Sequence, residues 1–221
     1  MTSVSQIREP AVAGFFYPSA PAELATTVDT LLAPAHDTPA GVTRVLLAPH
    51  AGYPYSGAVA GAGFSRLRAS HPRATRAFII GPSHVEAFAY TSVFGGSAYR
   101  TPLGDVPVDA DIARTLARES ASIRVAEAGH VLPGRGRGEH AIEVELPFLQ
   151  RTFPAMHIVP IVMGVQSWPA CEELGQAIER VADWTTDVII ASSDLSHFYD
   201  DRRARELDSV FCETFLTLDA S

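Results

Sequence analysis

Residues 77–84 read AFIIGPSH, a short apolar run that ends in glycine, proline and a histidine. The same arrangement recurs twice, because residues 44–50 read RVLLAPH and residues 187–197 read DVIIASSDLSH. Continuous apolar runs of this length are typical of strands that are buried on both faces of a parallel sheet. These three stretches therefore predict a buried sheet whose strands lead into histidines.

A fourth apolar run, residues 157–164 (HIVPIVMG), belongs to the same set of predicted strands. Between these runs the apolar residues recur with the period of a helix. The helix-like stretches are residues 20–32, 56–68, 109–119, 139–150, 168–184 and 201–216. Strands that alternate with helices are the pattern of an α/β fold. The sequence therefore predicts a mostly parallel central sheet flanked by helices, in one domain over residues 1–221.

Two glycine-rich segments do not fit this alternation. Residues 88–108 contain Gly95, Gly96 and the turn sequence TPLG at 101–104, which favour a hairpin or a folded-over loop. Residues 129–138 (GHVLPGRGRG) favour a mobile surface loop that leads into the helix expected at 139–150.

The composition excludes several classes of protein. An apolar fraction of 47% and a charged fraction of 19% are ordinary for a globular enzyme. A net charge of −8 without a dense basic stripe argues against nucleic acid as a partner. All 17 basic residues are arginine, so the chain has no lysine for a Schiff base or a P-loop.

The cysteines and the apolar runs indicate a compartment. Cys171 and Cys212 lie in helix-like stretches and form no CxxC motif and no disulfide framework, which fits a reducing cytoplasm. The first residues lack the features of a signal peptide, and no apolar run approaches the roughly 18 residues of a membrane span. We therefore expect a cytoplasmic protein that does not enter a membrane.

Three histidines follow predicted strands, namely His50, His84 and His197. The carboxyl ends of parallel strands share one edge of a sheet, and ligands bind at that edge. The three imidazoles are therefore expected to converge. Imidazole is the commonest protein ligand for zinc, iron and copper, so metal binding is the functional interpretation. The alternative for any one of them is an ordinary hydrogen-bonded polar residue.

Further candidates flank these histidines. His140, at the start of the helix expected at 139–150, either faces the same pocket or is exposed to solvent. Asp194 either orients an imidazole, binds metal or caps the following turn. Tyr53 is a candidate for hydrogen bonding a substrate oxygen, with a buried aromatic wall as the alternative. Glu143 and Glu145 are interpreted as a solvated face rather than as a catalytic pair.

Taken together, the motifs resemble the Memo-like family, also called AmmeMemoRadiSam system protein B. The residues that carry the resemblance are, in chain order, AGFFYP (13–18), APHAGYPYSG (48–57), GPSH (81–84), TPLG (101–104), EHAIEVELPFLQ (139–150), VPIVMG (159–164) and SSDLSH (192–197). The resemblance implies the fold of class III extradiol ring-cleavage dioxygenases, with a non-haem iron or copper-type site. It also implies partner proteins of the AmmeMemoRadiSam system.

The resemblance also implies roles for individual residues. His50 and His84 match the two metal-ligating histidines, His197 matches a pocket acid or base, and His140 matches a further pocket histidine. Fe(II) is the expected metal, with copper or zinc as alternatives. The family's third ligand is a cysteine in a Cys-Gly segment beyond SSDLSH, and this sequence ends at Ser221 without one. We therefore expect a fold shortened at its C-terminus, or a site that uses Asp194, His197 or water instead.

Three functions remain open on these grounds. The first is an oxidoreductase that activates O2 on a small diol or related substrate, with His197 taking a substrate proton. The second is a binding module that receives a peptide or protein partner in the same pocket without turnover. The third is a zinc hydrolase in which Asp194 and Glu139 help to activate a water.

Overall fold

Six strands form the central sheet of the computed structural model, which describes residues 6–32, 41–131 and 138–217. Their spatial order is β2-β9-β3-β8-β4-β7. The strands are β2 (Val45–Ala48), β3 (Arg76–Pro82), β4 (Thr91–Val93), β7 (Ile123–Val125), β8 (His157–Met163) and β9 (Asp187–Ser192). β2, β9, β3 and β8 are parallel to one another, and only the β4–β8 pair is antiparallel. The predicted mostly parallel sheet is confirmed.

A smaller sheet lies beside the central one. It contains β1 (Ile7–Arg8), β5 (Ala98–Thr101) and β6 (Gly104–Pro107), in the order β1-β5-β6. β5 and β6 form the antiparallel hairpin expected within residues 88–108. Gly104 begins β6 with φ of +117°, a conformation that a side chain disfavours.

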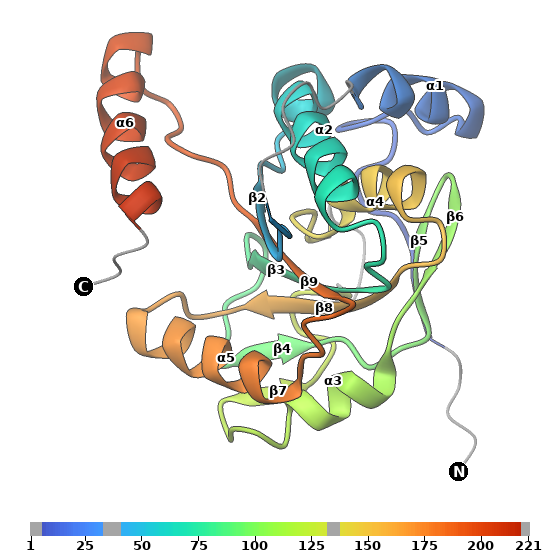
Figure 1. Ribbon diagram of the computed structural model, residues 1–221, viewed down its shortest axis with the longest axis vertical. Coiled ribbons are helices and arrows are strands. Elements are labelled where there is room, and N and C mark those ends of the chain that lie inside the picture. Colours follow the sequence, from blue (N-terminus) through green and yellow to red (C-terminus); the bar gives the residue numbers. More distant parts are fainter. Residues whose placement is uncertain (1–5, 33–40, 132–137, 218–221) are drawn as a thin grey trace.

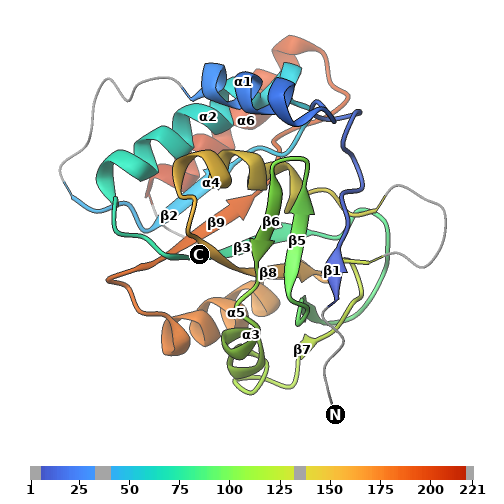
Figure 2. The same ribbon diagram turned by 90° about the vertical axis from the view of Figure 1, so that its right-hand side faces the viewer.

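Helices cover both faces of the central sheet (Figures 1 and 2). One face carries α1 (Pro21–Leu31), α2 (Tyr53–Ser70) and α4 (Leu146–Thr152), and the other carries α3 (Ala110–Leu116) and α5 (Trp168–Val181). α6 (Asp201–Thr217) stands apart from the other helices in Figure 1, and none of its residues is buried. No helix in the described part of the chain is long and apolar enough to span a bilayer.

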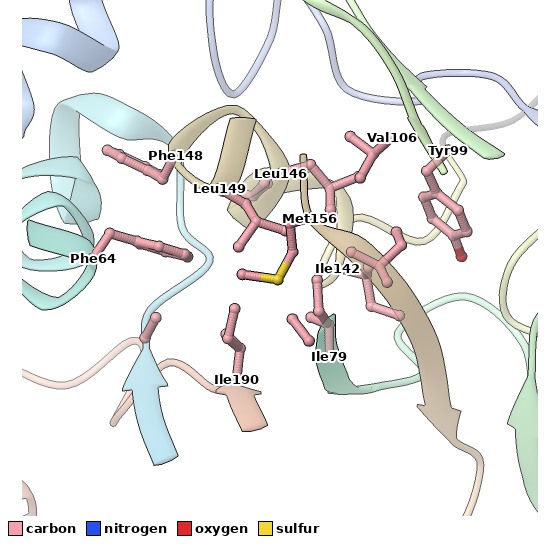
Figure 3. Close-up of a cluster of buried hydrophobic side chains, with 14 of the residues drawn as sticks. Phe64, Ile79, Tyr99, Val106, Ile142, Leu146, Phe148, Leu149, Met156 and Ile190 are labelled. Carbon is pink, nitrogen blue, oxygen red and sulfur yellow. The ribbon is translucent and has the colours of Figure 1, made fainter. Parts of the chain in front are cut away.

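The two faces of the sheet belong to two separate hydrophobic clusters. Side chains alternate across a strand, so neighbouring residues of β3 point to opposite faces. Ile79 packs with α1, α2 and α4 in one cluster, which Figure 3 shows around Phe148 and Leu149. Phe78 packs with residues of α3 and α5 in the other cluster. The central strands are thus buried on both faces, which explains their continuous apolar sequence.

The stretch 139–150 differs from the single helix expected there. A one-turn 3-10 helix, η1 (Glu143–Glu145), comes first, and the α-helix begins only at Leu146. Pro147 lies in the first turn of α4, where its missing N–H is tolerated because no intrahelical partner exists there. Residues 139–142 are therefore irregular backbone. Of the loop expected at 129–138, residues 132–137 lie outside the described residues.

The packing of β3 leads to a stability prediction. Ile79 is fully buried, so Ile79→Ala removes apolar contacts and is expected to lower the free energy of unfolding by about 2–5 kcal/mol. Val59 on α2 is 66% exposed, and Val59→Ala should change that free energy by less than about 0.5 kcal/mol. Urea unfolding followed by circular dichroism measures both, and equal losses would contradict the assignment of Ile79 to the core.

Candidate metal centre

Three histidines converge at the carboxyl edge of the central sheet. His50 follows β2 by two residues, His84 follows β3 by two residues, and His140 lies in the irregular segment before η1. One ring nitrogen of each lies within 4.8 Å of those of the other two. The ring centroids are 5.2 Å apart for His50 and His84, 5.6 Å for His50 and His140, and 4.6 Å for His84 and His140.

Gly81 in β3 allows this convergence. A Cβ at this position would lie 2.8 Å from the Cβ of Ala141, a distance that real side chains do not adopt. The missing side chain lets the segment that contains Glu139 and His140 lie against the end of the strand. The glycine of the GPSH motif therefore brings two distant parts of the chain together.

Glu139 fixes the orientation of His84. Its carboxylate accepts hydrogen bonds from the backbone N–H of His84 at 2.5 Å and from His84 Nδ1 at 2.9 Å. It also accepts the N–H groups of His140 and Ala141, at 2.7 and 2.9 Å. Burial raises the pKa of Glu139, but the hydrogen bonds from His84 and the backbone outweigh it and lower the value to about 2. The ionised carboxylate accepts the Nδ1–H of His84, so Nε2 carries the lone pair when that ring is neutral.

The other two rings are neutral near neutral pH. Burial lowers the pKa of His50 to about 4, and burial also lowers that of His140. His84 differs, because its hydrogen bond to Glu139 raises its pKa. Neutral imidazole is the form that binds metal, and metal-bound histidines commonly donate their second N–H to a carboxylate or another oxygen. The donor set of this cluster fits a transition metal.

Asp194 and His197 lie beside the cluster. Asp194 Oδ1 accepts the backbone N–H groups of His50 and Ala51, at 2.7 and 3.1 Å. Its Oδ2 lies 3.4 Å from His197 Nε2 and 4.0 Å from His50 Nε2. The His197 side chain is 53% exposed and does not belong to the three-histidine cluster of the described residues. The predicted convergence thus holds for His50 and His84, but the third imidazole is His140.

Tyr53 begins α2 and is buried. Its hydroxyl donates a hydrogen bond to the carbonyl of Val144 at 2.9 Å, and its ring packs against Phe148 with centroids 4.8 Å apart. Tyr53 also lines a cavity of about 370 Å³ together with Phe16, whose ring centroid lies 4.7 Å from that of His140. The contact of Tyr53 with a substrate stays a prediction.

The interpretation of Glu143 and Glu145 as a solvated face is wrong, because both are fully buried. Residues 8–17 cover the side of η1 that carries the Glu143 side chain. Glu143 accepts the N–H groups of Ala11 and Val12, at 2.8 and 3.0 Å. No local sequence pattern signals this burial, because the covering segment is about 130 residues away along the chain.

Arg8 joins the N-terminal segment to the histidine centre. Its guanidinium forms a buried ion pair with Glu143 and donates to the carbonyl oxygens of Glu139 and, at 3.2 Å, His130. Tyr17 also donates its hydroxyl to Glu143. This network holds the backbone of the residue that orients His84. Arg8 could not be identified from the sequence, because a single arginine near the N-terminus belongs to no recognisable motif.

The fold and the site place this chain in the class of mostly parallel α/β proteins that carry a cluster of histidines at the ends of their strands. A family model for Memo-like proteins matches residues 8–221. The chain is 35% identical over 214 residues to a MEMO1 family protein of Thermoplasma acidophilum, covering 96% of this chain and 75% of that relative. It is therefore a member of the Memo-like family.

Two further relatives agree with this assignment. A MEMO1 family protein of Thermotoga petrophila is 36% identical over 223 residues, with coverage of 96% of this chain and 78% of the relative. One of Methanocaldococcus jannaschii is 35% identical over 234 residues, with coverage of 97% and 78%. The family predicted from the motifs is confirmed.

The buried ion pair leads to a second stability prediction. Arg8→Met leaves Glu143 buried without its cation and should lower the free energy of unfolding by about 3–5 kcal/mol. The double variant Arg8→Met/Glu143→Met also removes the unpaired charge of Glu143 and should recover part of the lost free energy of unfolding. Arg100→Met breaks an exposed pair with Asp105 and should have little effect. Chemical denaturation tests this, and a loss from Arg8→Met no larger than that from Arg100→Met would contradict it.

Proposed function

We propose that His50, His84 and His140 bind a transition metal, as the centre of a metal-dependent oxidoreductase of the Memo-like family. The observation that carries the proposal is the convergence of three ring nitrogens within 4.8 Å. It is supported by the neutral state of two rings and by the Nδ1 hydrogen bonds of His50 and His84. Three nitrogen ligands with open positions suit Fe(II), copper or zinc.

Fe(II) is the metal we favour. When bound, it would supply Lewis acidity and the redox chemistry with dioxygen that the rest of the site lacks. A small diol or a related oxygen-bearing molecule is the proposed substrate class. The three histidines would hold the metal, while Asp194 fixes the backbone of the loop that carries His50.

His197 is the proposed acid or base. Its Nδ1 lies 2.8 Å from the carbonyl oxygen of Leu195, which can only accept, so the Nδ1–H donates and Nε2 carries the lone pair. A proton taken up at Nε2 would face the carboxylate of Asp194, 3.4 Å away. The 53% exposure of the His197 side chain lets a proton at this position exchange with solvent.

Metal content tests the first part of the proposal. We expect about one transition-metal ion per chain by elemental analysis of freshly purified protein. His50→Ala, His84→Ala and His140→Ala should each lower the affinity measured by calorimetry by more than about 100-fold, beyond the loss for a residue that only orients a ligand. His157 is exposed at the start of β8, and His157→Ala is the matched control. Metal binding that survives in all three cluster variants would refute the site.

Oxygen uptake tests the second part. Protein loaded with Fe(II) under anaerobic conditions should consume oxygen with one or more members of a catechol panel. His197→Gln should lower kcat by about 100- to 10,000-fold while the metal content is unchanged, because it removes only the proton transfer. Arg203→Gln on exposed α6 should leave kcat unchanged. The absence of uptake with both iron and copper would exclude the oxidoreductase.

A binding module is the second candidate function. The cavity of about 370 Å³ favours it, because its lining is largely apolar and includes Phe15, Phe16 and Leu31. Phe16 connects this cavity to the ring of His140. A peptide or protein partner, such as a protein of the AmmeMemoRadiSam system, is the proposed occupant. Metal binding without any oxygen uptake would favour this function over the first.

A further inference from the structure

Three groups meet at the hydroxyl of Ser192, the last residue of β9. The hydroxyl oxygen lies 2.8 Å from His50 Nδ1, 2.6 Å from the carbonyl oxygen of Ala141 and 2.9 Å from Glu145 Oε1. Ser192 and Glu145 are both buried, so no bulk water replaces these partners. The partners come from two distant parts of the chain, since Ala141 and Glu145 lie in the segment before α4 and His50, a histidine of the cluster, follows β2.

The hydrogen-bonding capacity of these groups fixes their protons. A serine hydroxyl has one proton to donate and two lone pairs to accept with. The carbonyl of Ala141 can only accept, and two oxygens 2.6 Å apart repel each other unless a proton lies between them. The single proton of Ser192 therefore points at Ala141. The other two partners must then donate to Ser192, His50 through its Nδ1–H and Glu145 through a protonated carboxyl.

The surroundings of Glu145 agree with a neutral carboxyl. The side chain is fully buried, and its Oε2 has no hydrogen-bond partner among the described residues. An ionised carboxylate in this position would be buried with a single hydrogen bond, which costs several kcal/mol of desolvation. The groups that act on it electrostatically include the carboxylate of Asp194. Burial raises the pKa of Glu145 to about 8, in the same direction.

We propose that Glu145 is a positioning residue, held as a neutral carboxylic acid, which acts through Ser192 to orient His50 and the segment that carries His140. With Glu145 as donor, the proton of Ser192 stays on Ala141, and this bond ties the residue next to His140 to the end of β9. The same arrangement presents Nε2 of His50, not Nδ1, to the cluster. An ionised Glu145 would instead draw the Ser192 proton away from Ala141.

This arrangement complements that of His84. The carboxylate of Glu139 accepts directly from His84 Nδ1, whereas a neutral carboxyl acts on His50 through a hydroxyl. His50 and His84 thus both present Nε2 to the cluster, although Glu139 is ionised and Glu145 is neutral. The effect of Glu145 on metal affinity rests on the proposed function. The protonation state of Glu145 and the tautomer of His50 do not.

Nuclear magnetic resonance of the metal-free protein tests the inference. With ¹³C-labelled glutamate and ¹⁵N-labelled histidine, the wild-type protein at pH 7 should show one protonated glutamate carboxyl, which is absent in Glu145→Gln. His50 should show a single Nδ1–H tautomer in the wild type. Ser192→Ala removes the acceptor, and both tautomers of His50 should then be populated. An ionised Glu145 at pH 7, or a protonated Nε2 of His50 in the wild type, would overturn the inference.

Two variants of Glu145 separate positioning from packing. Glu145→Gln keeps an N–H donor toward Ser192, whereas Glu145→Leu keeps a similar volume without a donor. We expect zinc affinity within about threefold of wild type for Glu145→Gln and a loss of about 10- to 100-fold for Glu145→Leu, the range for residues that orient ligands. If Leu binds zinc as tightly as Gln, Glu145 only fills space and the inference fails.

The outcomes for the two proposals are distinguishable. A wild-type protein that binds no metal, but shows neutral Glu145 and a fixed His50 tautomer, would refute the proposed function and leave this inference intact. Conversely, normal metal binding with an ionised Glu145 would refute this inference alone. The wild-type spectra also keep the test independent of whether any variant folds.

Discussion

The carboxylate of Glu139 accepts four N–H groups, two from His84 and one each from His140 and Ala141. These bonds join the end of β3 to a segment more than 50 residues further along the chain. All four hydrogen bonds stabilise the ionised form of this buried carboxyl. They therefore lower the pKa of Glu139 to about 2, although burial alone would raise it. This carboxylate orients the ring of His84 and helps to hold the backbone of His140, and the histidine cluster depends on both.

Part of this arrangement could be predicted from the sequence. Parallel strands end at a common edge, so apolar runs followed by Gly-Pro or Pro and then histidine were sufficient to place His50 and His84 together. The choice between His140 and His197 was not accessible in the same way. His140 reaches the cluster because Gly81 admits Ala141 against the strand, whereas His197 lies five residues beyond the end of β9 and is 53% exposed. The close approach at Gly81 is a contact between residues far apart in the sequence, which spacing does not reveal.

The buried glutamates show a second limit of sequence reasoning. Glu143 and Glu145 alternate with apolar residues in a stretch that has helical character, and such glutamates normally face solvent. Here the segment of residues 8–17 folds over η1 and supplies Arg8, Tyr17 and two backbone N–H groups to Glu143. A carboxylate is buried at low cost only when a cation pairs with it. The cation that pairs with Glu143 is Arg8, which lies 135 residues earlier in the chain. The α-helix expected at 139–150 begins only at Leu146, because the segment before it makes hydrogen bonds to other parts of the chain.

The charges around the cluster would suit the divalent cation that we propose. Glu143 is neutralised by Arg8, and a protonated Glu145 adds no charge, so the carboxylates that face the histidines are those of Glu139 and Asp194. Two negative charges beside three imidazoles balance a doubly charged ion, and in a partly buried site an imbalance of one charge is costly. A third carboxylate at Glu145 would therefore work against the balance as well as against the hydrogen bonds of Ser192. With that cation in place, the electrostatic argument would agree with the hydrogen-bonding argument for a neutral Glu145.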